Sequence, residues 1–192
     1  MDAIETEERN GLTIRIYPDY DSENPFRAWD QLGTFWHWHR RYDLGNGRIE
    51  ACALPALEQG WDALVKHLKR HHGATQVISV GMYDHGGITV YEGSRHPFDA
   101  QGWDSGTVGV LFDTTEGRRM CGTPDDLIRE CLLGELKTYD QHLTGDVYYY
   151  EVEDQSGEVI DSCSGFYGLE YAREEARAAA DSADLIAPGV GR

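Results

Sequence analysis

Four histidines of this chain have the spacing of metal ligands. His37 and His39 are two residues apart on an expected strand, so both imidazoles would lie on one face. His67 and His71 are four residues apart on an expected helix, which is also the spacing of a metal-binding pair. Together the four could hold zinc or iron in a metal-dependent enzyme. Lysines and arginines beside both pairs favour the alternative, which is half-exposed surface histidines and no bound metal or cofactor.

Nucleophilic chemistry has weaker support in the sequence. Cys163 could act as a nucleophile with His85 or His142, but a free cysteine in an expected strand is usually a small buried side chain. Ser105 misses the nucleophile-elbow pattern by one position, and the chain has neither a P-loop nor a dinucleotide fingerprint. These observations indicate no catalytic residues, and they favour a protein that is not an enzyme.

Charge is the most pronounced property of the chain. The net charge is −17, and it is unevenly spread, because residues 1–96 carry 14 acidic and 10 basic residues whereas residues 97–192 carry 20 and 7. An acidic half repels nucleic acids and anionic membranes, so we expect neither as a direct ligand. It suits a basic protein partner, such as one with a groove that holds DNA or RNA. Solubility and adaptation to high salt are the alternative explanations.

The acidic residues are concentrated around an expected hairpin. Its strands are residues 147–153 and 158–163, and a turn from Asp154 to Gly157 would place Glu153 opposite Glu158. Tyr148, Tyr150, Val152, Val159 and Cys163 would then face inward, and no cation would face the glutamates. The candidate partner-binding residues are therefore those of the hairpin and the last helix: Glu151, Glu153, Asp154, Glu158, Glu170, Glu174 and Glu175.

Hydrophobic periodicity predicts three main helices, at about residues 55–72, 124–144 and 169–183. Strands are expected at residues 12–17, 34–41, 76–83, 88–92 and 107–113, besides the two of the hairpin. Hairpins rather than βαβ units dominate this order, which indicates an α+β fold with a mostly antiparallel sheet. We expect a single domain over residues 11–186, with a mobile tail at residues 1–10 and a frayed end at residues 187–192. No apolar run reaches the length of about 18 residues that a membrane helix needs.

Four segments carry a resemblance to a known family. They are residues 83–89 (YDHGGIT), 103–109 (WDSGTVG), 136–148 (LKTYDQHLTGDVY) and 161–168 (DSCSGFYG). In this order they resemble a widespread family of uncharacterised bacteriophage and prophage proteins. The resemblance implies a phage origin and expression in the cytoplasm of a bacterial host, and it implies no catalytic residues.

These observations together predict a phage-encoded acidic binding protein. We expect it to inhibit a host defence system, by anti-restriction or anti-CRISPR activity, through occupation of a basic nucleic-acid-binding surface. The carboxylates of the hairpin and the last helix would imitate phosphates and accept charge-assisted hydrogen bonds from arginine and lysine. The alternatives are the metal-dependent enzyme that uses the histidines and a structural or assembly protein of the virion.

Overall fold

The computed structural model describes residues 2–99 and 101–186 of the chain. Its contacts divide the chain into two compact units, which we call unit 1 (residues 1–22 and 145–192) and unit 2 (residues 23–144). The sequence predicted one domain over residues 11–186, whereas the contacts group into these two units. Residues 187–192, expected to be frayed, lie outside the described residues.

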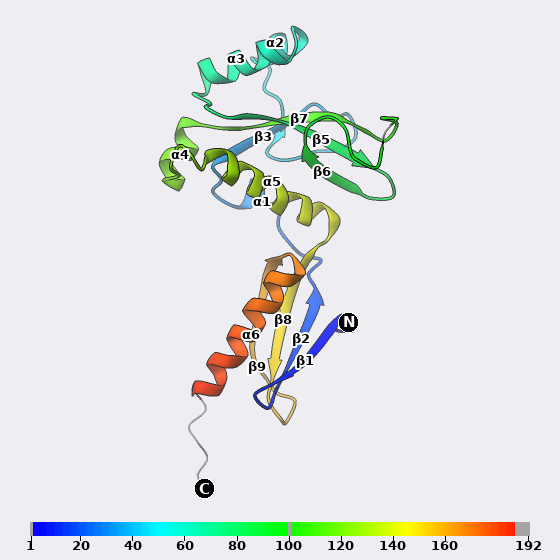
Figure 1. The fold of residues 1–192 in the computed structure, drawn as a ribbon, viewed down its shortest axis with the longest axis vertical. Helices are drawn as coiled ribbons and strands as arrows, with labels where there is room; N and C mark the ends of the chain where they lie inside the picture. The colour runs from blue at the N-terminus through cyan, green and yellow to red at the C-terminus, as the bar shows by residue number, and fades with distance from the viewer. Residues whose placement is uncertain (1, 100, 187–192) are drawn as a thin grey trace. The chain divides into compact units, whose positions relative to one another are not determined.

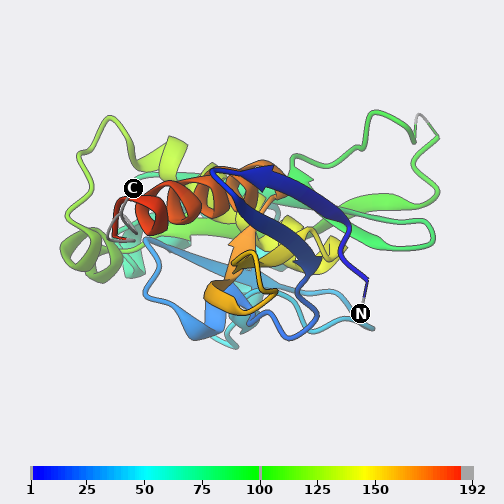
Figure 2. The ribbon, with the colours of Figure 1, turned by 90° about the horizontal axis from the view of Figure 1, so that it is seen from below.

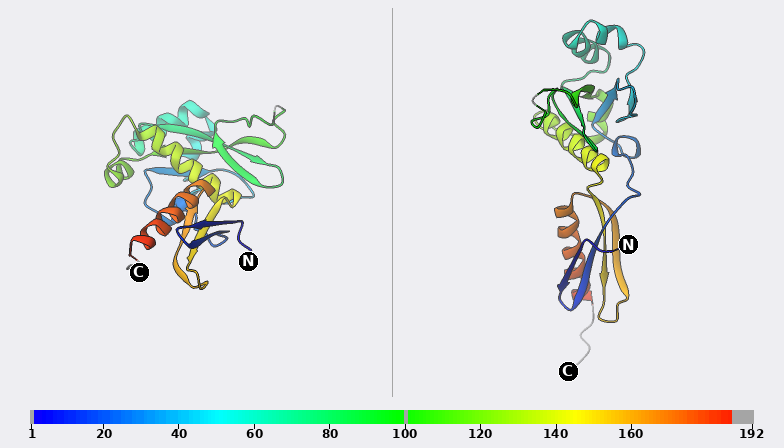
Figure 3. Two further views of the ribbon diagram at one scale, coloured as in Figure 1. Left: turned by 60° about the horizontal axis from the view of Figure 1, so that its bottom comes forward. Right: turned by 90° about the vertical axis from the view of Figure 1, so that its right-hand side faces the viewer.

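Unit 1 is a four-stranded antiparallel sheet with one helix packed along it. The strands are β1 (Glu5–Arg9), β2 (Leu12–Pro18), β8 (Val147–Glu153) and β9 (Val159–Tyr167), in the order β1-β2-β8-β9. The helix α6 (Leu169–Ile186) lies against one face of this sheet (Figures 1 and 3). Within residues 2–22 and 145–186 of unit 1, no helix lies on the opposite face of the sheet.

The core of unit 1 forms between this helix and the two central strands. Ile14 and Ile16 of β2 and Tyr150 and Val152 of β8 are buried beneath α6, since alternate residues of a strand share a face. The helix contributes mostly alanines: Ala172, Ala176 and Ala180, each 0% exposed. The alanine-rich side of α6 is therefore the side that packs against the sheet.

Strand β1 corrects the expectation of a mobile tail at residues 1–10. It pairs with β2 in register, with Glu5 opposite Ile16 and Arg9 opposite Leu12. Figure 2 shows this hairpin beside α6. The strand was missed because its sequence, Glu-Thr-Glu-Glu-Arg, has no apolar residue and so no hydrophobic alternation.

Unit 2 contains a five-stranded sheet in the order β4-β3-β7-β5-β6. All neighbours pair antiparallel except β3 and β4, which are parallel. The strands are β3 (Gly33–His37), β4 (Gly47–Arg48), β5 (Val77–Asp84), β6 (Ile88–Glu92) and β7 (Ser105–Asp113).

Helices cover both faces of this sheet (Figure 1). Helix α5 (Ile128–Thr144), with α1 (Pro25–Ala28), packs on one face, and α2 (Leu54–Glu58) with α3 (Trp61–His71) packs on the other. Two predicted helices are shorter than expected. The helix at 55–72 is interrupted at Gly60, which has a φ of 107°, and the helix expected from Pro124 begins at Ile128 after a turn.

The short helix α4 (Thr115–Cys121) was not predicted. Its Arg118 forms an ion pair with Asp113, whose side chain is fully buried and also accepts hydrogen bonds from Thr75 and from the backbone of Gln76. The α+β class, the mostly antiparallel pairing and the three main helices, α3, α5 and α6, are confirmed.

The burial of Leu136 gives a test of the packing of α5. Its side chain is 4% exposed in the core between α5 and the sheet, so Leu136→Ala should lower the free energy of unfolding by about 2–5 kcal/mol. Chemical denaturation measures the change. Lys137→Ala, an exposed position on the same helix, is the control and should have little effect. Equal midpoints for the two variants would show that another face of α5 is buried.

Candidate functional site

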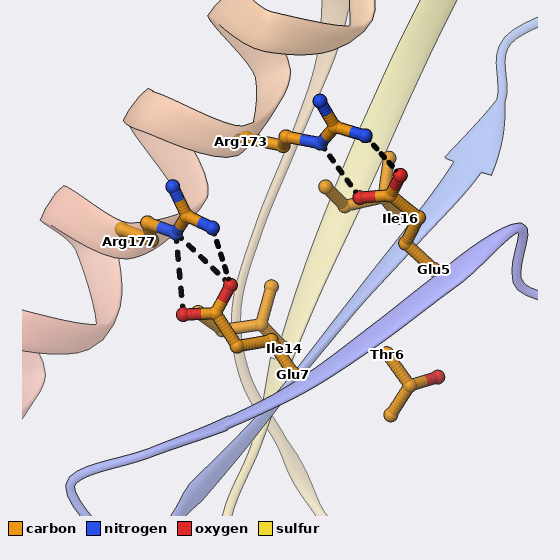
Figure 4. Close-up of a pocket in the computed structure, with 7 residues that line it drawn as sticks. All are labelled: Glu5, Thr6, Glu7, Ile14, Ile16, Arg173 and Arg177. Carbon is orange, nitrogen blue, oxygen red and sulfur yellow. Dashed lines mark hydrogen bonds and ion pairs between the residues drawn. The ribbon is translucent and has the colours of Figure 1, made fainter.

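Three ion pairs connect β1 to α6, and we call them the ladder. Arg173 bonds Glu5 with both nitrogens of one edge, and its Nε lies 2.7 Å from Glu5 Oε2. Arg177 Nη2 lies 2.8 Å from Glu7 Oε2. Figure 4 shows these two arginines bridging from the helix to the strand above Ile14 and Ile16, around a pocket of about 300 Å³.

In the third ion pair of the ladder, which we call its third rung, the charges of strand and helix are reversed. Here the strand supplies the arginine, and Arg9 Nε lies 2.7 Å from Oδ1 of Asp181 on α6. Hydrogen bonds from the arginines lower the pKa of the three carboxyl groups, Glu5, Glu7 and Asp181, and burial partly opposes this. The ladder therefore keeps its carboxylates ionised and fully engaged within unit 1.

A fourth pair lies on the face of the sheet opposite α6. Arg15 Nε is 2.9 Å from Glu153 Oε1, which corrects the expectation that no cation faces this glutamate. Arg15 was overlooked because β2 is far from β8 in sequence, although the two strands are neighbours in the sheet. Glu151 is directly opposite Arg15 in the register and lies near Tyr17, whose pKa is raised by burial and by the charge of Glu151.

These pairs occupy every arginine in the described part of unit 1, and the sequence of unit 1 has no lysine. Glu170 is also engaged, because it accepts a hydrogen bond from Arg173 at 2.7 Å. No ion pair of the described residues includes Asp154, which instead accepts hydrogen bonds from N–H groups of its own loop. Among the described residues, no ion pair reaches four further acidic side chains of β9, its hairpin and the outer side of α6: Glu158, Asp161, Glu174 and Glu175. We call these four the acidic group.

The hairpin between β8 and β9 differs from the expected one. Its loop includes Glu158, since Asp154 N–H donates to the carbonyl of Glu158, and Glu153 is paired with Val159 rather than with Glu158. Asp154 shapes this loop, because its Oδ1 accepts hydrogen bonds from the N–H groups of Ser156 and Glu158 at 2.8 and 3.0 Å. Asp154, a predicted partner-binding residue, therefore already uses one carboxylate oxygen to hold its own loop.

The predicted inner face of the hairpin is correct for β8, and in β9 it holds only for Cys163, which lies directly opposite Tyr150. Tyr148, Tyr150 and Val152 contact the core beneath α6, but Val159 and Cys163 are exposed. Asp161 lies close to Tyr150, and burial, followed by the charge of Asp161, raises the pKa of Tyr150 to about 12. Register irregularities interrupt the pairing of β8 with β9 at two places, and β9 is exposed from Val159 to Gly165.

The seven predicted partner-binding residues thus fall into three places. Glu151 and Glu153 are on the open face of the sheet, Asp154 and Glu158 are in the hairpin loop, and the other three are on α6, which covers the opposite face. Sequence reasoning missed Asp161, which lies in β9 next to the loop. It also missed the rungs of the ladder, since their partners are about 170 residues apart in the chain.

The four predicted metal ligands do not meet. His37 follows Trp36 on β3, and Trp36 packs toward α3, so His37 points to the α5 face, where its Nε2 lies 3.3 Å from Asp43 Oδ1. Burial lowers the pKa of His37. His39 stacks on the ring of Tyr42, with 5.0 Å between ring centroids.

His67 and His71 lie together on α3, with 4.5 Å between ring centroids. The two predicted pairs are therefore separated by the sheet of unit 2. Among the described residues, no group of three or more His, Cys, Asp or Glu side chains is arranged to hold a metal ion. Cys163 belongs to unit 1, whereas its suggested partners His85 and His142 belong to unit 2.

Unit 2 has a polar pocket of about 560 Å³ beside the β5–β6 hairpin. Two carboxylates line it, and both have partners, since Asp84 accepts a hydrogen bond from Tyr42 at 2.9 Å and Asp104 lies 3.1 Å from His85 Nδ1. The His–Asp pair is exposed, with 71% of the His85 side chain accessible. Ser105 also lines the pocket, but in the described part of the chain no hydroxyl or thiol is hydrogen-bonded to His85.

Fold and site together define an acidic, two-unit α+β protein with its charge concentrated in unit 1. Comparisons of the chain with protein-family models, with curated proteins and with solved structures find no match. None of the helices in the described part of the chain combines the length and the apolar character that a bilayer span requires.

The ladder predicts that β1 depends on opposite charges. Glu7→Arg would place two cations together at the second rung, so hydrogen exchange of the β1 amides should become faster. The double variant Glu7→Arg with Arg177→Glu should restore slow exchange. Glu8→Arg makes the same charge change at an exposed position of β1 and is the control.

The protection of the β1 amides should also depend on pH. Because the folded-state pKa values of Glu5, Glu7 and Asp181 are lowered, the pairs contribute fully above the ordinary carboxyl pKa and are lost as pH falls through the lowered values. Protection factors in β1 should be constant above about pH 5 and decrease below about pH 4. Loss of protection at neutral or higher pH would contradict the ladder.

The separation of the histidines predicts no stoichiometric metal. Elemental analysis of the purified protein should find well under one zinc or iron per chain, because each predicted pair alone supplies only two ligands. About one metal per chain, lost in both His37→Ala and His67→Ala, would overturn this prediction and restore the metal-dependent enzyme.

Proposed function

We propose that unit 1 docks on a basic, nucleic-acid-binding surface of a host defence protein in the bacterial cytoplasm, and thereby blocks restriction or CRISPR interference. The family resemblance of the sequence supplies the phage setting. The distribution of charge supplies the mode of binding.

The charge of unit 1 is the observation that carries the proposal. Unit 1 has 17 acidic and 5 basic residues, a net charge of −12, whereas unit 2 has 17 and 12, a net charge of −5. Most of the excess negative charge thus belongs to the smaller unit. General solubility or salt adaptation would instead spread the acidic residues over the whole surface. Its described arginines are all engaged internally, so the acidic group is left to attract an external cation.

A basic groove would recognise these carboxylates as it recognises phosphates. Arginine and lysine donate charge-assisted hydrogen bonds to both, and long-range attraction raises the association rate at low salt. Glu158, Glu174 and Glu175 suit this role better than Glu153, because the latter already accepts from Arg15. The separated histidines are the reason we prefer a binding protein to a metal-dependent enzyme.

The test compares two variants with the same net charge. Glu158→Gln/Glu174→Gln/Glu175→Gln neutralises three members of the acidic group, and Asp125→Asn/Asp126→Asn/Glu130→Gln neutralises three exposed acids of unit 2. Each is expressed in bacteria with an active restriction or CRISPR system, and phage plating efficiency is measured. The unit 1 variant should lose protection of the phage, and the unit 2 variant should retain it.

Binding to the isolated defence protein completes the test. The unit 1 variant should associate on the order of tenfold more slowly at low salt, with a smaller difference at high salt, where charges are screened. DNA should compete with the wild-type protein for the same surface. Equal behaviour of both variants, with no competition by DNA, would leave the acidity as a solubility feature.

A further inference from the structure

Strand β9 forms an open edge of the unit 1 sheet. It pairs with β8 on one side, and no strand among the described residues pairs with its other side. It is nine residues long, and its first seven residues, Val159 to Gly165, are all exposed. An edge of this length presents a row of backbone N–H and C=O groups that can accept a further strand.

Only some of the usual protections of an edge are present in β9. Its pairing with β8 has two register irregularities, but lysine and proline are absent from it, and its one charged residue is Asp161. The opposite edge, β1, is only five residues long, and three of its side chains are held in the ladder. Of the two edges, β9 is therefore the one available for a partner.

A groove beside β9 adds a place for a side chain. It has a volume of about 320 Å³ and lies between the start of β9 and the C-terminal half of α6. Ile160, Ala179 and Ala183 make it apolar, and Asp161 and Ser182 supply its polar groups. An arginine or lysine fits this combination, because its aliphatic stem packs on apolar atoms while its charged end reaches a carboxylate.

We propose that β9 binds an extended basic segment of another protein as a fifth strand of the unit 1 sheet, with an arginine or lysine of that segment in the groove. This inference rests on the proposed function, since it specifies how the basic partner of unit 1 is held. Backbone hydrogen bonds supply the alignment, and Asp161 in β9, with Glu158 directly before the strand, selects positive charge.

A second copy of this chain fits the edge less well. Pairing β9 with β9 of another copy would bring two units of net charge −12 together and add a second Asp161 to the same sheet. Like charges across neighbouring strands are unfavourable. Asp161 at this edge thus repels further copies and attracts a basic strand.

The experiment uses the full chain and two nine-residue peptides. One peptide alternates arginine and valine, and the other has the same sequence with every backbone nitrogen methylated, which keeps its charge but removes its hydrogen-bond donors. Affinity is measured by calorimetry, and hydrogen exchange is followed at the amides of β9 and, as an internal control, of β1.

We expect the first peptide to slow exchange in β9 and not in β1. The methylated peptide should bind at least about tenfold more weakly, because it cannot donate backbone hydrogen bonds to β9. Asp161→Asn should weaken the first peptide several-fold. Ala179→Leu, which fills the groove, should do the same, and unchanged exchange in β1 would show that each variant remains folded.

Three results would overturn the inference, and they differ in what they leave standing. Equal binding of both peptides without protection of β9 would leave the acidic surface as a binding site but exclude strand addition. No binding of either peptide would refute the proposed function as well. Protection of β9 in the protein alone, with a dimer in sedimentation, would identify a second copy as the occupant.

Discussion

The close packing of α6 on the sheet of unit 1 positions the charged groups of the ladder. Ala172, Ala176 and Ala180 are fully buried over the isoleucines of β2. Because alanine has no atoms beyond Cβ, the helix lies near the sheet, and its flanking arginines reach the edge strand β1. A larger residue at any of the three positions would separate the layers, and overpacking of this kind is itself destabilising.

The ladder sets a register more than it adds stability. Partly exposed ion pairs contribute only about 0–1 kcal/mol each. Their spacing, however, matches, because four helical residues advance about 6 Å and two strand residues about 6.6 Å. The reversed third rung makes the match unique: a shift by one rung would bring Arg9 beside Arg177 or Glu7 beside Asp181. Either shift places like charges together.

The sequence predicted those elements whose own residues carry a periodic apolar pattern. Helix α5 and strand β2 each bury one clear set of residues, and β7 carries an apolar run that is buried on both faces, so the α+β class followed from them. Strand β1 could not be found this way, since it is held by charges on a helix far along the chain. The hairpin register was wrong because the Asp154 side chain folds a longer loop than the turn residues alone suggest.

The position of the acidic residues could be predicted from the sequence, but their ion-pair partners could not. Counting charges located the acidity near the hairpin and the last helix, and the structure leaves part of it unpaired there. Counting could not tell which acids are already engaged, because Glu153 and Glu170 meet their arginines only in the folded sheet and helix. The sequence also could not show whether the two histidine pairs meet, since only the folded structure places them on opposite faces of the unit 2 sheet.

The division of unit 1 between the two ends of the chain orders its assembly. Residues 23–144 are inserted between β2 and β8, so the ribosome delivers all of unit 2 before the second half of unit 1 exists. A two-stranded hairpin such as β1–β2 is marginal alone, whereas unit 2 has a core that needs no later residue. A nascent chain released before β8 would thus carry a folded unit 2 and only the β1–β2 hairpin of unit 1, and synthesis through β8, β9 and α6 would be needed for a molecule with both units.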